Sequence, residues 1–238
     1  MTVKQAMVLA AGLGVRMRPL TNDTPKPLLA VGGKAMIDHA LDHLAAIGIG
    51  DCVVNAHYLA DMVATHLESR DLPAIHLVTE PDLLDTGGGV SHVRQLLGPD
   101  PFYVVNGDIL WRDGPTPALA RLAQAWDDGA MDALLLVHPT EDAFGYDGGG
   151  DFFLGHGGGG PLRRRIKGEA APFVFTGIQI LHPGLFSDAP EGAFSLNFLY
   201  DRALAAGRLH GLVHDGEWFH IGTPETLARA EQHLSAGP

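Results

Sequence analysis

Residues Met7 to Leu28, MVLAAGLGVRMRPLTNDTPKPL, predict a buried strand that opens into an irregular loop. The stretch continues an apolar run, Ala6 to Leu9, of the kind found in buried parallel strands. Gly12 and Gly14 end that run. Glycines directly after a strand allow the backbone to approach a ligand and to point its N–H groups at an anion. The loop is therefore a candidate anion-binding site.

Two cations on the same loop strengthen this interpretation. Arg16 carries a planar guanidinium, which matches the geometry of phosphate oxygens. Lys26 lies between Pro25 and Pro27, so its backbone is stiff and its ammonium is presented with little freedom. Two cations on a glycine loop after a first strand indicate a triphosphate site.

Three common patterns do not account for the loop. A dinucleotide-binding fingerprint needs a third glycine at the position of Met17, and a P-loop needs Ser or Thr at the position of Ala35 after Gly33-Lys34. A secretory signal would place an apolar segment after Lys4, but the glycines interrupt that segment and Arg16 closes it.

Composition narrows the class of protein. A chain of 238 residues can bury one sizeable core, so we expect a single domain over residues 1–238. The net charge of -12 argues against general binding to nucleic acid or to a membrane surface. Cys52 is the only cysteine, which excludes a disulfide framework. No apolar run reaches membrane-spanning length, and a cytoplasmic location is expected.

Apolar runs alternate with stretches of helical spacing over the first 140 residues or so. The strands are expected at Ala6–Leu9, Cys52–Asn55, Ile75–Val78, Phe102–Val105 and Ala133–Val137, and the helices at Ala35–Ile47, Leu59–Leu67, Val90–Leu97 and Thr116–Trp126. This order predicts an α/β, Rossmann-like fold with a mostly parallel mixed sheet and helices on both faces. Ligands of such sheets bind beyond the carboxyl ends of the strands, where Gly12, Thr86 and Asp108 lie.

The pattern changes after Val137. Residues Gly145 to Gly160 include nine glycines around Asp151–Leu154, which predicts a hairpin with loose ends. The elements expected after it are strands at Val174–Leu181 and Glu217–Ile221 and helices at Asn197–Ala206 and Pro224–Leu234. Thr223 is the expected N-cap of the last helix, with Pro224 at its first position.

Several of these segments together resemble the sugar-1-phosphate nucleotidyltransferases. The resemblance rests on Leu9-Ala-Ala-Gly-Leu-Gly-Val-Arg16, Pro19-Leu-Thr21, Pro25-Lys-Pro-Leu28, Asp85–Gly89, Val105–Asp108, Phe175–Ile178 and Trp218–Thr223, and so spans nearly the whole chain. Within this family the chain most resembles the short N-acetylmuramate 1-phosphate uridylyltransferases of cell-wall recycling. The family fold implied is the nucleotide-diphospho-sugar transferase fold with a small hairpin region at the sugar site.

The resemblance implies that a sugar 1-phosphate attacks the α-phosphorus of UTP and releases pyrophosphate, with Mg²⁺ (or Mn²⁺) as the metal. Arg16 would stabilise the departing pyrophosphate, Lys26 would bridge the two reacting phosphates, and Asp108 would bind the metal. Asn-Gly-Asp is also good turn chemistry, so Asp108 taken alone could be only a turn residue. The other implied contacts are Leu9, Ala10, Ala11, Gly12, Gly14, Glu80, Thr86, Gly87 and Gly88 for the nucleotide and Asn106, Asp151, Thr176 and Gly177 for the sugar phosphate.

His220 departs from the family pattern, which usually has Asp at that position as the second metal ligand. Imidazole is a poor ligand for hard Mg²⁺ and a better one for Mn²⁺ or Zn²⁺. His220 is therefore an uncertain second ligand. His39 and His43 share a helix face, and we interpret them as polar surface rather than as a metal site.

Several alternatives remain open. The basic segment Arg163–Arg165 with Lys167 is interpreted as a solvated strand edge, and a flap over the sugar site is the rival interpretation. The chain could also be a catalytically weak relative that binds nucleotide sugar. Within the enzyme class, the alternatives are glucose-1-phosphate thymidylyl- or uridylyltransferase, mannose-1-phosphate guanylyltransferase and phosphocholine cytidylyltransferase. Either a monomer or a homodimer is compatible with the sequence.

Overall fold

Strand β1 (Gln5–Leu9) lies inside a nine-stranded sheet, hydrogen-bonded on both sides. The computed structural model describes residues 3–155 and 157–235. Ala6, Met7 and Val8 of β1 are fully buried, as a strand covered on both faces requires. The sheet order is β5 (Ala74–Thr79), β4 (Asp51–Ala56), β1, β6 (Phe102–Asn106), β11 (Phe173–Leu181), β8 (Ala133–Pro139), β12 (Leu209–Val213), β10 (Gly159–Arg164) and β9 (Phe152–Leu154).

The two halves of this sheet differ in strand direction. Strands β5, β4, β1 and β6 are parallel, whereas β11 is antiparallel to both β6 and β8. Beyond β12, which is parallel to β8, strands β10 and β9 continue antiparallel. The α/β mixed sheet is confirmed, but the prediction that it is mostly parallel is wrong in the second half. An apolar run indicates a buried strand and carries no information on its direction.

The hairpin around Asp151–Leu154 is confirmed as β9 and β10. It belongs to the main sheet, because β9 also pairs with β11 through Phe152 and Phe173. This extra pairing closes β11, β8, β12, β10 and β9 into a small barrel. Closure removes the exposed edge that the hairpin would otherwise present.

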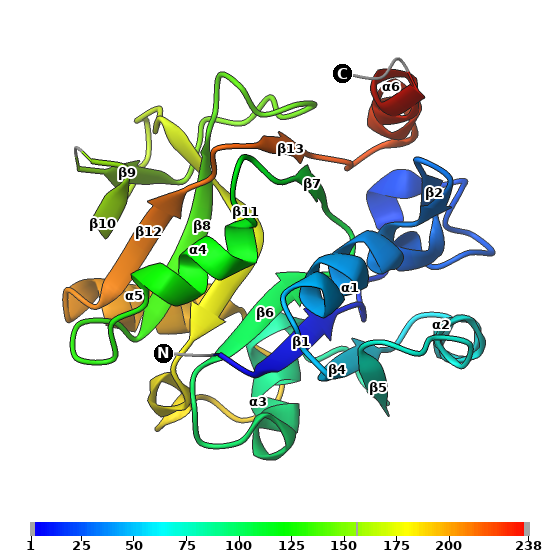
Figure 1. The fold of residues 1–238 in the computed structure, drawn as a ribbon, viewed down its shortest axis with the longest axis horizontal. Helices are drawn as coiled ribbons and strands as arrows, with labels where there is room; N and C mark the ends of the chain where they lie inside the picture. The colour runs from blue at the N-terminus through cyan, green and yellow to red at the C-terminus, as the bar shows by residue number, and fades with distance from the viewer. Residues whose placement is uncertain (1–2, 156, 236–238) are drawn as a thin grey trace.

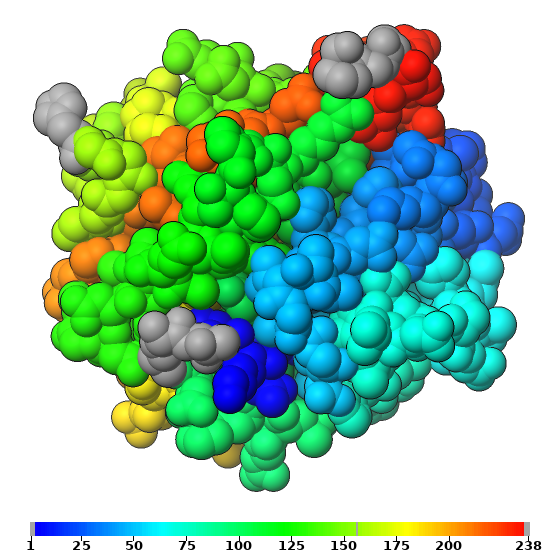
Figure 2. Space-filling view, viewed as in Figure 1, coloured from blue at the N-terminus to red at the C-terminus, as the bar shows by residue number. Residues whose placement is uncertain are grey.

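Helices cover both faces of the sheet, as predicted. Figure 1 shows α1 (Met36–Ala46) and α4 (Ala118–Ala125) in front, with α2 (Ala60–Leu67) beside β5, and Figure 2 shows α1 and α4 covering this face in space-filling form. Their buried side chains, such as Ile37 and Leu122, belong to one core cluster. Helices α3 (Asp85–Leu97) and α5 (Leu196–Ala205) contact each other and contribute Val90 and Leu199 to the cluster on the other face.

A third cluster connects the two ends of the chain. It packs α6 (Pro224–Ser235) against the pair β2 (Ala30–Val31) and β3 (Lys34–Ala35) and the pair β7 (Leu110–Arg112) and β13 (Glu217–Phe219). Met17 from the glycine loop and Phe219 are fully buried there. The loop that carries Arg16 is thereby fixed to the last helix. Among residues 3–155 and 157–235, no helix is long and apolar enough to cross a bilayer.

Candidate active site

An ion pair lies where the glycine loop meets the end of β6. Lys26 begins a short 3₁₀ helix (Lys26–Leu28), and Pro25 before it is extended, so the lysine points inward. Its Nζ donates a hydrogen bond of 2.7 Å to Oδ2 of Asp108. The lysine side chain is 11% exposed and that of Asp108 37%, so the carboxylate can still reach a ligand. The pair lies between two cavities and lines both.

The first cavity has a volume of about 340 Å³ and lies over the carboxyl ends of β1, β4 and β6. Six of the predicted nucleotide contacts line it: Leu9, Ala10, Ala11, Gly12, Gly14 and Thr86. Gly14 has a φ of 60°, a conformation that favours glycine, and its carbonyl accepts a hydrogen bond of 2.8 Å from the Thr21 hydroxyl. A cavity lined by apolar side chains and by the glycine loop suits a base and its phosphates.

Glu80 lies behind this cavity and does not line it. Its Oε1 accepts a hydrogen bond of 2.7 Å from Asn55 Nδ2, and Asn55 Oδ1 accepts one of 2.9 Å from the Ala10 amide. Its Oε2 accepts a longer bond of 3.2 Å from the Leu84 amide, just before α3. Buried Glu80 therefore fixes the cavity wall through Asn55, a lining residue that the sequence analysis missed. The position of Asn55 at the carboxyl end of β4 was the sequence signal that could have identified it as a site residue.

Gly87 and Gly88 lie in the first turn of α3 and do not line the cavity. Their amides donate hydrogen bonds of 2.8 and 3.0 Å to the Phe194 carbonyl. A Cβ on Gly87 would overlap the Phe194 ring, and one on Gly88 would overlap the Gly192 carbonyl. These glycines permit close packing of α3 on residues 192–194. The expectation from the sequence was that they contact the nucleotide. Asp85, which precedes them, does line the cavity and has a strained φ of 59°.

The second cavity, of about 270 Å³, lies on the other side of the Lys26–Asp108 pair. Its lining includes all four predicted sugar-phosphate contacts, Asn106, Asp151, Thr176 and Gly177. The β11 register shifts between Phe175 and Gln179, and Gly177 within this bulge has a φ of 85°. A Cβ there would lie 2.7 Å from Asn106 Nδ2, so only glycine allows β11 to approach the asparagine.

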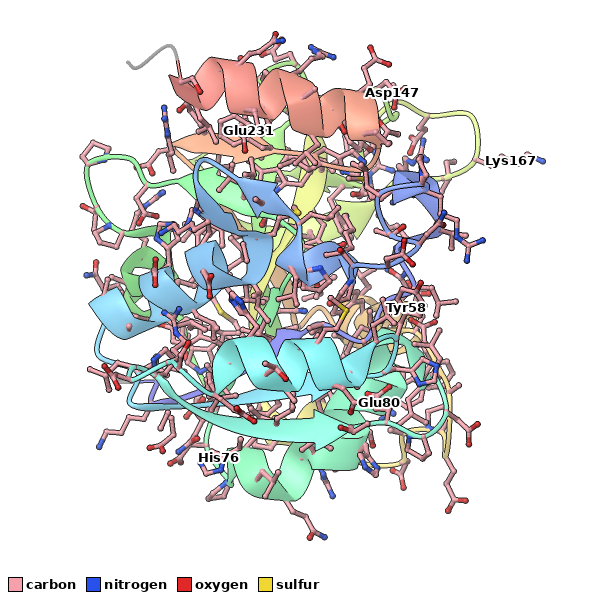
Figure 3. All side chains as sticks on the ribbon, turned by 90° about the vertical axis from the view of Figure 1, so that its right-hand side faces the viewer. Tyr58, His76, Glu80, Asp147, Lys167 and Glu231 are labelled. Carbon is pink, nitrogen blue, oxygen red and sulfur yellow. The ribbon has the colours of Figure 1, made fainter. Side chains whose placement is uncertain are left out.

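His220 and Arg16 also line the second cavity, beside Tyr146 and Trp218. Burial lowers the pKa of His220, and the nearby positive charges of Lys26 and Arg16 lower it further. His220 is therefore neutral at pH 7. Arg16 also lines a wider cavity, of about 810 Å³, between residues 141–147 and α6. Figure 3 shows Asp147 from this wider cavity on the same side of the molecule as Tyr58 and Glu80.

The residues here can bind a metal only together with a ligand. Within residues 3–155 and 157–235, no three His, Cys, Asp or Glu side chains converge as a metal site. Asp108 offers a partly exposed carboxylate, and His220 lines the same cavity. One or two protein ligands completed by substrate phosphates and water suit Mg²⁺. The other histidine pair is engaged elsewhere: His39 Nε2 contacts the Val31 carbonyl at 2.8 Å, and His43 Nδ1 contacts Asp113 at 3.1 Å.

Tyr58 is a further residue that the sequence analysis missed. Its hydroxyl lies 2.8 Å from the Thr21 carbonyl and 2.9 Å from that of Asn22, so it fastens the loop between Arg16 and Lys26. A tyrosine two residues before a helix gives no sequence signal for that role. In the basic segment, Arg163 and Arg164 pair with β9, whereas the pairing of β10 with β12 involves Gly159–Pro161.

Comparison with known proteins agrees with this geometry. Residues 5–147 match the model of the family described as Nucleotidyl transferase. The chain is 44% identical to an N-acetylmuramate alpha-1-phosphate uridylyltransferase of Caulobacter vibrioides, over 98% of this chain and 97% of that protein. It is 31% identical to a protein of the same name from Neisseria meningitidis serogroup B, over 95% and 96%.

A solved structure shows the same fold. The crystal structure of a UDP-glucose pyrophosphorylase complexed with UDP-glucose superposes with a TM-score of 0.81 at 16% identity, covering 100% of both chains. The family match covers the glycine loop, the Lys26–Asp108 pair and the whole first cavity. The chain therefore belongs to the nucleotidyl transferase family and is a sugar-1-phosphate nucleotidyltransferase.

Proposed function

We propose that this enzyme transfers the uridylyl group of UTP to N-acetylmuramate 1-phosphate, giving UDP-N-acetylmuramate and pyrophosphate in peptidoglycan recycling. The observation that carries the proposal is the 44% identity to the Caulobacter uridylyltransferase over nearly the full length of both chains. The site is compatible with it, because six of the nine predicted nucleotide contacts line one cavity and the four sugar-phosphate contacts line the adjoining one.

The reaction requires two polyanions to meet at the Lys26–Asp108 pair. An oxygen of the sugar phosphate attacks the α-phosphorus as the bond to the β-phosphate breaks, and pyrophosphate leaves. The attacking phosphate is already ionised, so no general base is needed. Catalysis then depends on positioning and on charge stabilisation. Lys26 lines both cavities, and we assign it the contact with both reacting phosphates. We assign Arg16 the stabilisation of negative charge on the pyrophosphate; its side chain lines the second and the wider cavity.

A divalent metal, proposed as Mg²⁺, would be held by Asp108 with the nucleotide phosphates, and by His220 where the metal accepts nitrogen. Bound there, it would supply positive charge to the phosphate oxygens. The Lys26 hydrogen bond orients the Asp108 carboxylate before any ligand enters. Gly177 and Asn106 pack closely against each other in the wall of the second cavity, which Lys26 also lines.

A matrix of the common nucleoside triphosphates against several sugar 1-phosphates, assayed for pyrophosphate, tests the proposal. We expect the highest kcat/KM with UTP and N-acetylmuramate 1-phosphate. Another preferred pair would reassign the substrate. Nucleotide binding without product from any pair would favour a nucleotide-sugar-binding relative, for which His220 is the one supporting feature.

A further inference from the structure

The glycine tract Gly148–Gly150 contacts two side chains, Tyr146 in the lining of the second cavity and Arg165 outside that lining. A Cβ on Gly148 would overlap the Tyr146 hydroxyl, and one on Gly149 would lie 2.6 Å from Nη1 of Arg165. Gly150 donates its amide proton to the Tyr146 hydroxyl at 3.1 Å. The tract thus gives close backbone contact to a tyrosine that lines the cavity and to an arginine that follows β10.

Strand register places Arg165 on the same face of the hairpin as Asp151. In the β9–β10 hairpin, Arg163 pairs with Phe153 and Arg164 with Phe152. The Arg165 amide donates a hydrogen bond of 2.9 Å to the Asp151 carbonyl, which extends the pairing of β9 and β10 by one residue pair. Residues opposite each other in an antiparallel pair project their side chains from the same face. Arg165 therefore projects beside Asp151, a residue of the cavity wall.

Arg165 differs from its neighbours in having no carboxylate partner. Arg163 pairs with Glu169 at 2.8 Å, and Arg164 pairs with Asp201 at 2.9 Å. Over the part of the chain that the structure describes, Arg165 has no carboxylate within ion-pair distance, and its Nη1 makes one long bond of 3.4 Å to the Glu169 carbonyl. Asp151 makes no ion pair with it; Oδ2 of Asp151 accepts the Phe175 amide at 2.9 Å.

The remaining cation of the segment lies elsewhere. Figure 3 shows Lys167 projecting into solvent from an outer loop, away from the body of the molecule. Arg165 is therefore the cation of this segment that contacts the backbone of the glycine tract and has no carboxylate partner among the described residues. A guanidinium in that position matches a planar carboxylate.

We propose that Arg165 binds an acidic substituent on the sugar and so selects acidic amino-sugar 1-phosphates over neutral ones. The inference rests on the proposed function, since N-acetylmuramate differs from N-acetylglucosamine by a lactyl ether whose carboxylate would meet Arg165. Asp151 and Tyr146 lie near Arg165. Asp151 accepts a hydrogen bond from the β11 backbone, and Tyr146 is a neutral phenol whose pKa is raised by burial. Neither side chain holds the guanidinium in an ion pair.

The test compares wild type, Arg165→Gln and the matched control Arg163→Gln on N-acetylmuramate 1-phosphate and N-acetylglucosamine 1-phosphate at saturating UTP. The neutral sugar is measured as kcat/KM where it turns over and as an inhibition constant where it does not. We expect Arg165→Gln to lower kcat/KM for the acidic sugar about five- to tenfold, as for a partly exposed charged contact, and to leave the neutral sugar unchanged. Arg163→Gln should preserve the preference, because Glu169 already occupies that arginine.

An equal loss for both sugars, or no loss for either, would overturn the role of Arg165. The same selective loss in Arg163→Gln would also overturn it, because general charge of the segment would then explain the effect. A wild-type enzyme that makes no UDP-N-acetylmuramate contradicts the proposed function itself. A wild-type enzyme that makes it, with an unaltered preference in Arg165→Gln, contradicts only this inference.

Discussion

Replacing Lys26 by methionine should abolish most of the turnover while the fold persists. The lysine side chain is 11% exposed, so its stem is part of the packing. Truncation to alanine would remove about three buried methylenes, or ~2 kcal/mol of burial, and would confuse stability with catalysis. Methionine keeps a comparable stem and removes the charge. Asp108, left without its partner, is 37% exposed and remains solvated by water.

The expected loss follows from the position of the ammonium between the two cavities. Removing one preorganised donor from developing charge costs about 2.7–4 kcal/mol, or ~10²–10³ in kcat. Nucleotide affinity should change much less, because the walls of the first cavity remain. Pyrophosphate release is measured under saturating substrates, with a UTP titration and a thermal melt on the same protein. Lys34→Met is the control, since Lys34 pairs with Asp42 at an exposed site.

Two results would contradict this reasoning. If Lys26→Met weakened UTP binding and left kcat at saturation unchanged, the ammonium would serve ground-state binding alone. If Lys34→Met lost as much turnover, the effect would reflect net charge and not the position of Lys26.

Three further outcomes are expected. Asp108→Asn should abolish turnover and leave the thermal melt within a few degrees of wild type, and wild-type rates at limiting Mg²⁺ would refute a metal role for this carboxylate. His220→Asp should raise the rate with Mg²⁺ and shrink any preference for Mn²⁺, because it supplies a hard oxygen ligand; identical metal profiles in both proteins would show that residue 220 does not contact the ion. The free energy of unfolding should fall as the pH drops below 6.5, because burial lowers the pKa of His214 from its ordinary 6.5 and the unfolded chain therefore takes up the proton more readily. Urea unfolding at about pH 7.5 and about pH 5.5 measures this slope, and His214→Gln should flatten it.

The first half of the fold could be predicted because its elements are long and regularly patterned. The β1 run and the helical spacing of α1 each agree with the structure to within a residue or two at their ends. In the second half, β12 was missed, since its sequence, Leu-His-Gly-Leu-Val, is short and interrupted by glycine. The antiparallel direction of β11 is set by its pairing with β6 and β8, which no local pattern records.

Some site residues could likewise be predicted from the sequence, and others could not. Arg16, Lys26 and Asp108 stand out in sequence because charge on a glycine loop or after a strand is unusual, and all three line the second cavity. Gly87 was assigned to the nucleotide. Glycine also serves close packing, however, and only the fold shows that Gly87 packs against Phe194. Asn55 was missed because a single amide at a strand end gains meaning only from its hydrogen bonds to Glu80 and Ala10.

The glycines of residues 145–160 should also differ sharply in how many substitutions they tolerate. Gly150 has a φ of 70°, and a Cβ there would overlap the Ala171 backbone carbonyl, so nearly every replacement should be eliminated from a library selected for function. Gly155 has open space around it and no positive φ, so most replacements there should survive. A segment that composition alone would class as a uniform flexible linker thus contains both a nearly invariant position and a freely variable one, five residues apart.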